Sequence, residues 1–405
     1  MTATAAHRNR VLSGMRPTGR LHLGHYHGVL KNWVALQHDY ECFFFVADWH
    51  ALTTHYDDPR VIPASVWDMV VDWLAAGVDP SAATLFIQSR LPEHAELHLL
   101  LSMITPLGWL ERVPSFKDQQ EQLKQKDLAT YGFLGYPLLQ AADILIYKAA
   151  LVPVGEDQVA HVELSREIAR RFNHLYGRGP DFLDQAEQAR RKMGKQAGRR
   201  YEQLRKLFQE QGDPEALAEG QVLVEAQGNL GTTDKELLLG HLEGSGRVIL
   251  PEPRPLLTKA SKMPGLDGRK MSKSYDNTIS LRDDPVRVGK QLRTMPTDPA
   301  RVRRTDPGDP ARCPVWQFHE VYGTDAQRQW VTEGCRSASI GCLDCKQLVI
   351  DAVLEELAPI QARARELEAE PRQVLDIMNA GCTAAQRVAA ETMAEVRQVM
   401  SLLYP

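Results

Sequence analysis

The chemistry that is most visible in the sequence is a compact group of hydrogen-bond donors suited to a polyphosphate. The residues of this group are Lys270, Met271, Ser272, Lys273 and Ser274. Proline and glycine before the group and Asp276-Asn277 after it predict a loop. A lysine is a flexible point charge that can follow a phosphate through a change of geometry. The group therefore predicts a phosphate-binding loop, with a solvated basic surface loop as the alternative.

A second candidate for phosphate contact lies near the start of the chain. The run Val11–Gly14 predicts a buried strand, and Tyr26–His38 predicts a helix. Between them, His22 and His25 share one face of the first helical turn, and Gly24 lets a ligand approach the backbone closely. A strand, a glycine-containing turn and a helix together aim backbone N–H groups at a phosphate. Taken alone, histidines at this spacing are more often structural than catalytic.

An otherwise apolar helical pattern over Tyr136–Ala149 carries one polar stripe. Tyr136, Gln140 and Asp143 are spaced to share one side of that helix. Buried polar groups need partners, so such a stripe is either satisfied internally or positioned for a ligand. The residues alone favour internal satisfaction.

Four of the six cysteines form a pattern that is typical of metal binding. These are Cys313, Cys335, Cys342 and Cys345, and the last two form a C-x2-C pair. Zinc and a [4Fe–4S] cluster both accept four thiolates, so the residues alone leave both open. We expect Cys42 and Cys382 to be ordinary buried thiols.

The composition sets the class of protein that must position these groups. A length of 405 residues, 43% of them hydrophobic and 25% charged, is ordinary for a globular protein of several domains. The net charge of -4 argues against a surface that is basic throughout. The longest apolar run, Leu99–Leu110, is interrupted by Pro106 and Gly108, so no membrane-spanning segment is expected. The first ten residues lack an apolar core, which predicts a cytoplasmic protein with reduced or metal-bound cysteines.

The order of apolar runs predicts a doubly wound parallel α/β sheet of the Rossmann type. Cys42–Ala47 and Thr84–Gln88 read as further buried strands, with a helix over Pro63–Ala76 between them. Ligands of such sheets bind at the carboxyl ends of the strands, where Gly14 and Asp48 fall. For Asp48, a capping role is the alternative to contact with a substrate.

The second half of the chain is mainly helical. Residues 182–248 combine basic clusters with Glu and Gln, and we expect a small helical lobe. A solvated surface is the first interpretation of its basic clusters, and contact with RNA phosphates is the second. Lys346–Leu403 has an amphipathic helical pattern with expected breaks at Pro371 and Gly381.

The two phosphate motifs together resemble a known family. His22-Leu23-Gly24-His25 and Lys270–Ser274, in this order, resemble the two signature motifs of class I aminoacyl-tRNA synthetases. Three further stretches, Ser13–Gly19, Ala47–Thr53 and Val154–Gln158, look like the tryptophanyl-tRNA synthetase family. The resemblance covers nearly the whole chain except residues 182–248.

This resemblance implies a domain plan and a reaction. Residues 1–181 and 249–284 would form the catalytic domain, 182–248 a helical insertion, and 285–405 an α-helical anticodon-binding domain that carries the four cysteines. The implied reaction is ATP-dependent activation of L-tryptophan to tryptophanyl-adenylate, followed by transfer to tRNA(Trp). A tyrosyl-tRNA synthetase is one alternative, and a non-catalytic RNA-binding paralogue that keeps a metal cluster is another.

The resemblance also implies roles for single residues. His22, His25, Lys270 and Lys273 would act on the phosphates. The ATP site would further include Arg16, Pro17, Thr18, Gly24, Gly155, Glu156, Asp157, Gln158, Met271, Ser272 and Ser274. Asp143 would accept a hydrogen bond from the indole N–H, and Tyr136 and Gln140 would hold the ammonium or carboxylate of tryptophan. Gln140 is shared with tyrosyl enzymes, so the contacts of the amino group stay open.

The cofactors and partners also follow from the resemblance. Mg²⁺ would bridge phosphate oxygens. The four-cysteine spacing resembles that of a subset of bacterial tryptophanyl-tRNA synthetases, and this resemblance implies a [4Fe–4S] cluster, with zinc as the alternative. A homodimer is implied as well.

Overall fold

The fold centres on one parallel β-sheet, described here from a computed structural model that covers residues 9–113, 130–155, 158–179, 181–244, 246–257 and 263–404. The strands are β1 (Arg10–Met15), β2 (Glu41–Val46), β3 (Ala83–Ile87), β4 (Leu151–Val154) and β5 (Arg254–Leu257). Their order in the sheet is β3-β2-β1-β4-β5, and every pair is parallel. The chain therefore reverses its direction of winding beside β1, where ligands of such sheets bind. The predicted doubly wound sheet is confirmed.

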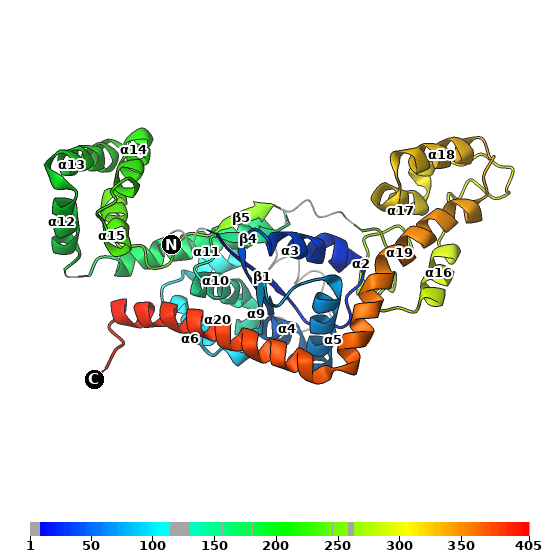
Figure 1. Cartoon of the computed structure of the whole chain (residues 1–405), viewed down its shortest axis with the longest axis horizontal. Helices are drawn as coiled ribbons and strands as arrows, with labels where there is room; N and C mark the ends of the chain where they lie inside the picture. The colour runs from blue at the N-terminus through cyan, green and yellow to red at the C-terminus, as the bar shows by residue number, and fades with distance from the viewer. Residues whose placement is uncertain are drawn as a thin grey trace.

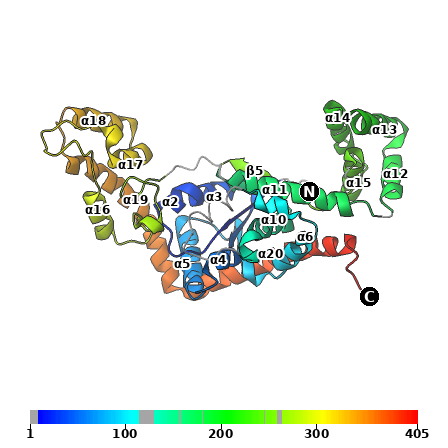
Figure 2. The same cartoon turned by 180° about the vertical axis from the view of Figure 1, so that it is seen from behind.

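Helices cover both faces of the sheet (Figures 1 and 2). The helices of this part are α2 (Leu23–His25), the π-helix η1 (Tyr26–Leu30), α3 (Lys31–Leu36), α4 (Asp48–His55), α5 (Val61–Ala76), η2 (Gln88–Arg90), α6 (Glu93–Ser102), α7 (Leu107–Glu111), α9 (Tyr131–Leu134), α10 (Tyr136–Ile146) and α11 (Val159–Tyr176). Val11 and Phe44 belong to one apolar core, whereas Leu12 and Phe43 belong to the other. Neighbouring residues of a strand point to opposite faces, so β1 and β2 are buried on both sides.

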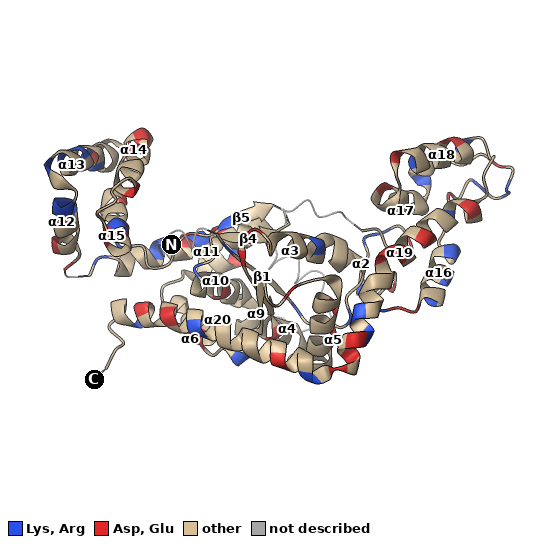
Figure 3. Ribbon diagram, viewed as in Figure 1, with Lys and Arg blue, Asp and Glu red and all other residues tan. Residues whose placement is uncertain are grey.

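The segment over 182–248 forms a lobe of four helices at one end of the molecule (Figure 1). These are α12 (Phe182–Lys192), α13 (Gly194–Gln211), α14 (Pro214–Glu225) and α15 (Thr232–Glu243). The lobe has an apolar core of its own that includes Tyr201 and Leu238. Figure 3 shows Lys and Arg gathered on α12 and α13. Several of them are paired inside the lobe, for example Arg200 with Glu219, as a solvated charged surface would be.

The C-terminal region begins at the opposite end of the molecule and returns beneath the sheet (Figures 1 and 2). After the 3-10 turn η4 (Lys273–Tyr275), its helices are α16 (Pro285–Thr294), η5 (Pro310–Arg312), α17 (Pro314–Tyr322), α18 (Asp325–Arg336), α19 (Cys342–Ala369) and α20 (Pro371–Val399). The predicted break at Pro371 is confirmed, because Pro371 opens α20 immediately after α19. The helical C-terminal region is therefore partly a cover for the catalytic sheet.

The predicted break at Gly381 is wrong, because α20 is one continuous helix from Pro371 to Val399. A Cβ atom at Gly381 would lie 1.8 Å from the carbonyl oxygen of Leu85 in β3. The glycine thus allows the helix to approach the strand backbone, and it does not end the helix. In the described parts of the chain, no helix is long and apolar enough to cross a membrane.

Candidate active site

The two predicted phosphate motifs lie side by side at the carboxyl end of β1. The N–H of Leu23 donates to the carbonyl of Ile279 at 3.0 Å, and the N–H of Leu281 donates to the carbonyl of Leu21 at 3.0 Å. Between these bonds, His22 and Ser280 form an antiparallel bridge. Segments far apart in the sequence are thus joined backbone to backbone, next to the point where the strand order reverses.

The two histidines present hydrogen-bond donors to this space. His22 Nδ1 accepts from the N–H of Gly24 at 3.1 Å, and His25 Nδ1 accepts from the N–H of His22 at 3.3 Å. Burial, with the charge of Lys273 as the second cause, lowers the pKa of His22 to about 4. Burial and the neighbouring His22 hold the pKa of His25 well below its usual value. Both rings are neutral near pH 7 with Nδ1 as acceptor, so each carries its proton on Nε2.

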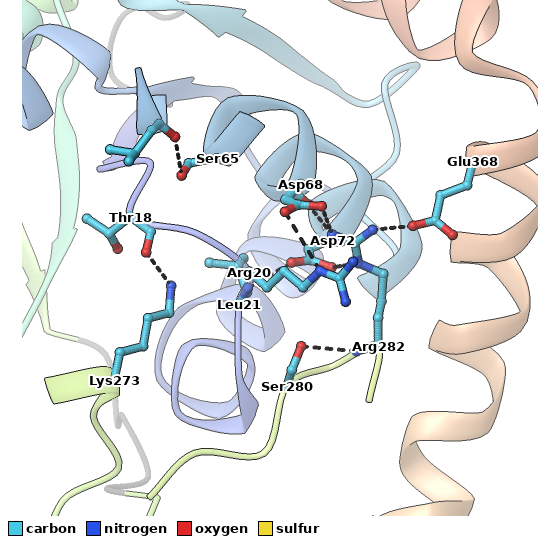
Figure 4. Close-up of polar contacts among 11 residues, drawn as sticks. Thr18, Arg20, Leu21, Ser65, Asp68, Asp72, Lys273, Ser280, Arg282 and Glu368 are labelled. Atoms are coloured by element: carbon cyan, nitrogen blue, oxygen red, sulfur yellow. Dashed lines mark hydrogen bonds and ion pairs between the residues drawn. The ribbon is translucent and has the colours of Figure 1, made fainter. Parts of the chain in front are cut away.

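The lysine-containing stretch lies beside the histidine motif. Lys273 Nζ donates to the carbonyl of Thr18 at 2.8 Å (Figure 4). Met271 is 4% exposed. Its Cβ would lie 3.5 Å from a Cβ atom added at Gly24, so the two motifs pack closely at this point. The side chains of Lys270 and Ser274 are exposed toward solvent. The stretch thus offers cations and a hydroxyl beside the two imidazoles.

Asn277, which sequence reasoning treated only as a turn former, fixes the conformation of this loop. It is 2% exposed. Its Oδ1 accepts from the N–H of Ser272 at 2.8 Å, and its Nδ2 donates to the carbonyl of Lys270 at 3.2 Å and to Asp267 Oδ1 at 2.7 Å. A buried amide with three bonds holds both lysines at a fixed spacing.

Asp143 lies at the centre of a buried polar network. Its carboxylate is fully buried and accepts from His50 Nε2 at 2.8 Å, from His94 Nδ1 at 2.7 Å and from Gln88 Nε2 at 2.8 and 3.0 Å. His94 in turn bonds the hydroxyl of Tyr147 at 2.7 Å through Nε2. Internal satisfaction, which the residues alone favoured, is what the structure has.

Two atoms beside this network are left for a ligand. Gln88 Oε1 and His98 Nδ1 are buried and have no hydrogen-bond partner among the described residues. Burial, countered by the nearby charge of Asp143, lowers the pKa of His98. Unpaired buried polar atoms are rare in folded proteins, and at a site they indicate where a bound molecule completes the network. Gln88, His94 and His98 were not singled out from the sequence, although Gln88 directly follows the apolar run Thr84–Ile87 and His98 lies between leucines.

The other two members of the polar stripe meet at a third histidine. His161 on α11 bonds Gln140 Oε1 through Nδ1 at 2.7 Å and the hydroxyl of Tyr136 through Nε2 at 3.3 Å. Tyr136, Gln140 and Asp143 therefore lie on one face of α10, as predicted, but in two separate clusters. The position of His161, 21 residues from Gln140, gave no sequence signal.

The remaining predicted ATP residues surround the same strand ends. Arg16 and Pro17 follow β1 directly, and Gly155 follows β4. Gln158 directly precedes α11. Glu156 and Asp157 lie outside the described residues. Asp48 accepts from the N–H of Ser89 at 3.0 Å, which agrees with the capping alternative.

The four predicted metal ligands converge on one cavity in the C-terminal region. Its lining includes Cys313, Cys335, Cys342, Cys345, Arg301 and Lys346. Burial, with the other three thiols as further causes, raises the pKa of Cys345 to about 12. None of the six cysteines forms a disulfide. Within the described ranges, however, no set of three or more His, Cys, Asp or Glu side chains is arranged to hold a single metal ion.

Comparison with known proteins assigns this arrangement to a class. The family model described as tRNA synthetases class I (W and Y) matches residues 4–207 and 234–358. The chain belongs to this family. The gap between the two matched ranges, residues 208–233, lies inside the four-helix lobe.

Within the family, the chain is similar to tryptophan–tRNA ligases from several organisms. The tryptophan–tRNA ligase of Ralstonia nicotianae is 64% identical over 395 residues, which cover 98% of this chain and 99% of that protein. The tryptophan–tRNA ligase of Thermotoga maritima is 44% identical over 397 residues, which cover 98% and 100%. The crystal structure of tryptophanyl-tRNA synthetase from Campylobacter jejuni, complexed with ADP and tryptophan, matches with a TM-score of 0.72 at 26% identity, over 97% of this chain and 99% of that one.

Proposed function

We propose that the protein is a tryptophan–tRNA ligase that activates L-tryptophan with ATP and transfers it to tRNA(Trp). The observation that carries the proposal is the backbone pairing of Leu21–Leu23 with Ile279–Leu281, which brings two neutral histidines and Lys273 to one strand end. The 64% identity to a tryptophan–tRNA ligase supports tryptophan as the amino acid.

In the first step, a carboxylate oxygen of tryptophan attacks the α-phosphorus of ATP. The bond from this phosphorus to the bridging oxygen breaks, and pyrophosphate leaves with the electron pair. The Nε2–H groups of His22 and His25 donate to phosphate oxygens near the reacting phosphorus. Lys270 and Lys273 stabilise the charge that develops on pyrophosphate, and Ser272 and Ser274 add donors. Such catalysis is mostly positioning and electrostatic stabilisation, for which fixed donors suffice.

In the second step, a ribose hydroxyl at the 3′ end of tRNA attacks the carbonyl carbon of the adenylate, and AMP leaves. Mg²⁺ would bridge phosphate oxygens of ATP without a protein cage of its own. The nucleotide would lie along Arg16–Thr18, Gly24, Gly155 and Gln158, because Arg16 directly follows β1 and Gly155 directly follows β4. By the family resemblance, Glu156 and Asp157 would belong to the same site. A homodimer, which the family resemblance implies, is part of the proposal.

The tryptophan side chain would enter beside Asp143. Gln88, His50 and His94 already occupy the four acceptor positions of this carboxylate, so the indole N–H must displace one of these donors. The unpaired Gln88 Oε1 supports the idea that the network changes when a ligand enters. Tyr136 and Gln140, joined through His161, would receive the polar groups of the amino acid.

The four cysteines fit an iron–sulfur cluster better than a zinc ion. The four thiols line one cavity, and four thiolates are a ligand set that a [4Fe–4S] cluster accepts. Arg301 supports the same choice, because its Nε is buried without a partner while its Nη1 lies 3.8 Å from Cys335 Sγ. Bound there, the cluster would supply a cross-link among α18, which carries Cys335, α19, which carries Cys342 and Cys345, and Cys313 at the start of α17.

The proposal is tested by ATP–pyrophosphate exchange on anaerobically purified protein with tryptophan, with tyrosine or without amino acid. We expect exchange with tryptophan alone. Exchange driven by tyrosine would keep the mechanism but replace the substrate, for which Gln140 is the residue that favours a tyrosyl enzyme. Absence of exchange in protein that still binds tRNA would favour the non-catalytic alternative.

A further inference from the structure

A buried arginine lies at the end of the segment that joins the two phosphate motifs. The side chain of Arg282 is 6% exposed. It follows Leu281, whose N–H donates to the carbonyl of Leu21. Figure 4 shows its guanidinium group facing carboxylates from two helices, α5 and α19.

The carboxylate of Asp72 connects Arg282 to the histidine motif. Asp72 lies on α5 and is fully buried. Its Oδ2 accepts from the N–H of Leu21 at 2.8 Å, and its Oδ1 accepts from Arg282 Nε at 2.8 Å. Leu21 immediately precedes His22. One carboxylate therefore joins the backbone of the first paired segment, at Leu21, to the side chain of Arg282, which follows the second segment.

Two more carboxylates fix the orientation of the guanidinium group. Arg282 Nη2 donates to Asp68 Oδ1 at 2.5 Å, and Nη1 donates to Glu368 at the end of α19. Arg20 adds a second cation 3.7 Å from Asp68 Oδ2. The fork of an arginine can serve three carboxylates at once in a fixed plane, which the point charge of a lysine cannot. Arg282 and its three carboxylate partners, Asp72, Asp68 and Glu368, are called the clamp below. The clamp is thus specific to arginine.

The clamp matters because the pairing that it supports is short. The bridge between His22 and Ser280 is isolated from the named strands, with one backbone hydrogen bond on each side. Asp72 and Asp68 also face Lys273, whose pKa burial lowers and these two carboxylates raise. The cluster around Arg282 therefore contacts the backbone next to the histidines and acts electrostatically on the lysine.

We propose that Arg282 is a positioning residue for amino-acid activation. Through Asp72 it holds His22 and the loop that carries Lys273 at the mutual distance that the transition state requires. The inference rests on the proposed function and adds to it a residue outside both signature motifs. Arg282 acts through its neighbours, since all its side-chain bonds described above go to protein atoms.

The test compares Arg282→Gln with Glu368→Gln, a matched control that removes only the α19 contact of the same guanidinium. We expect Arg282→Gln to lower kcat of tryptophan-dependent exchange about 100-fold, because a displacement of about 1 Å has that cost. Tryptophan Kd by equilibrium dialysis should stay within about twofold, since the binding site does not use the clamp. Glu368→Gln should also stay within about twofold of the unsubstituted kcat.

Active-site titration and the melting temperature separate positioning from folding, and Arg282→Lys carries the comparison where Arg282→Gln does not fold. We expect an intermediate kcat for the lysine variant. Unchanged kcat per active site in the Arg282 variants would overturn the inference, and so would equal losses of kcat and tryptophan affinity. If Glu368→Gln lowers kcat as much as Arg282→Gln does, the inference is also wrong, because the contact between Arg282 and α19 would then account for the effect. Absence of exchange in the unsubstituted protein would instead overturn the proposed function.

Discussion

His27 in η1 donates from Nε2 to Glu356 of α19 at 2.8 Å and thereby ties the helix of the histidine motif to the C-terminal region. Lys31 and the hydroxyl of Tyr322 bond the same carboxylate. Burial alone would raise the pKa of Glu356, but these partners lower it to about 2. A folded-state pKa below the unfolded value means that the stabilisation is present above about pH 4.5 and is lost as the pH falls toward 2.

Glu356→Gln should therefore lower the free energy of unfolding at pH 7 by on the order of 2 kcal/mol. The difference from the unsubstituted protein should shrink between about pH 4.5 and pH 3, because the carboxyl group of the unfolded chain takes up a proton in this range and the paired Glu356 of the folded protein does not. Urea unfolding of the two proteins at pH 7 and at pH 3 measures the difference in the free energy of unfolding. The exposed neighbour Glu355, changed to Gln, is the control. A pH-independent difference would show that the ion pairs do not account for the stabilisation.

Lys273→Ala should lower kcat of tryptophan-dependent exchange about 10²- to 10³-fold, which is the usual cost of one lost donor to developing charge. Tryptophan Kd should stay within about twofold, because the proposed role of Lys273 is toward the phosphates of ATP and not toward the amino acid. Lys206→Ala, an exposed lysine of α13, is the control. Equal losses in kcat and in tryptophan affinity would count against a role in the transition state.

Asp143→Asn should remove the preference for an indole N–H over an isosteric sulfur. The unsubstituted protein should favour tryptophan over 3-benzothienylalanine about tenfold or more, since an analogue without the donor leaves the carboxylate unpaired. Exchange kinetics with both amino acids give the ratio. Tyr147→Phe, which removes only the hydroxyl on His94, is the control and should keep it. If Asp143→Asn keeps the preference for tryptophan over 3-benzothienylalanine, the indole N–H donates to another acceptor, such as Gln88 Oε1.

Gly381→Ala should destabilise the protein by about 3 kcal/mol or more, because the added methyl group meets backbone and not a movable side chain. Thermal unfolding followed by circular dichroism measures the change. Gly108→Ala in α7, where a Cβ meets nothing within 4 Å, should be neutral or slightly stabilising. Equal stability of the two variants would mean that α20 can move away from β3 at little cost.

Cys345→Ser should abolish the iron and acid-labile sulfide of anaerobically purified protein, together with the visible absorption of the cluster. Cys382→Ser, at a buried thiol of α20, should leave both unchanged. If the unsubstituted protein contains stoichiometric zinc and no iron, the site is a zinc site and the assignment of an iron–sulfur cluster is wrong.

The sequence by itself determined the features that are local. Apolar runs of strand length specified β1, β2 and β3, and the spacing of Tyr136, Gln140 and Asp143 specified one face of α10. The two phosphate motifs were visible because each consists of neighbouring residues. In each case, the periodicity of one element or the chemistry of one loop carries the information.

Only the tertiary structure decided how distant segments meet. Arg282 and Asp72 are 210 residues apart, and Asp143 and His50 are 93 residues apart, so no periodic pattern links either pair. For the same reason, the residue type of Gly381 predicted a helix break, whereas the close approach of α20 to the backbone of β3 is what requires a glycine there. Whether a buried polar residue is a partner or a ligand-binding group depends on which side chains the fold brings to it. Those contacts are set by packing over the whole chain, which is why the clamp at Arg282 and the partners of Asp143 appeared only in three dimensions.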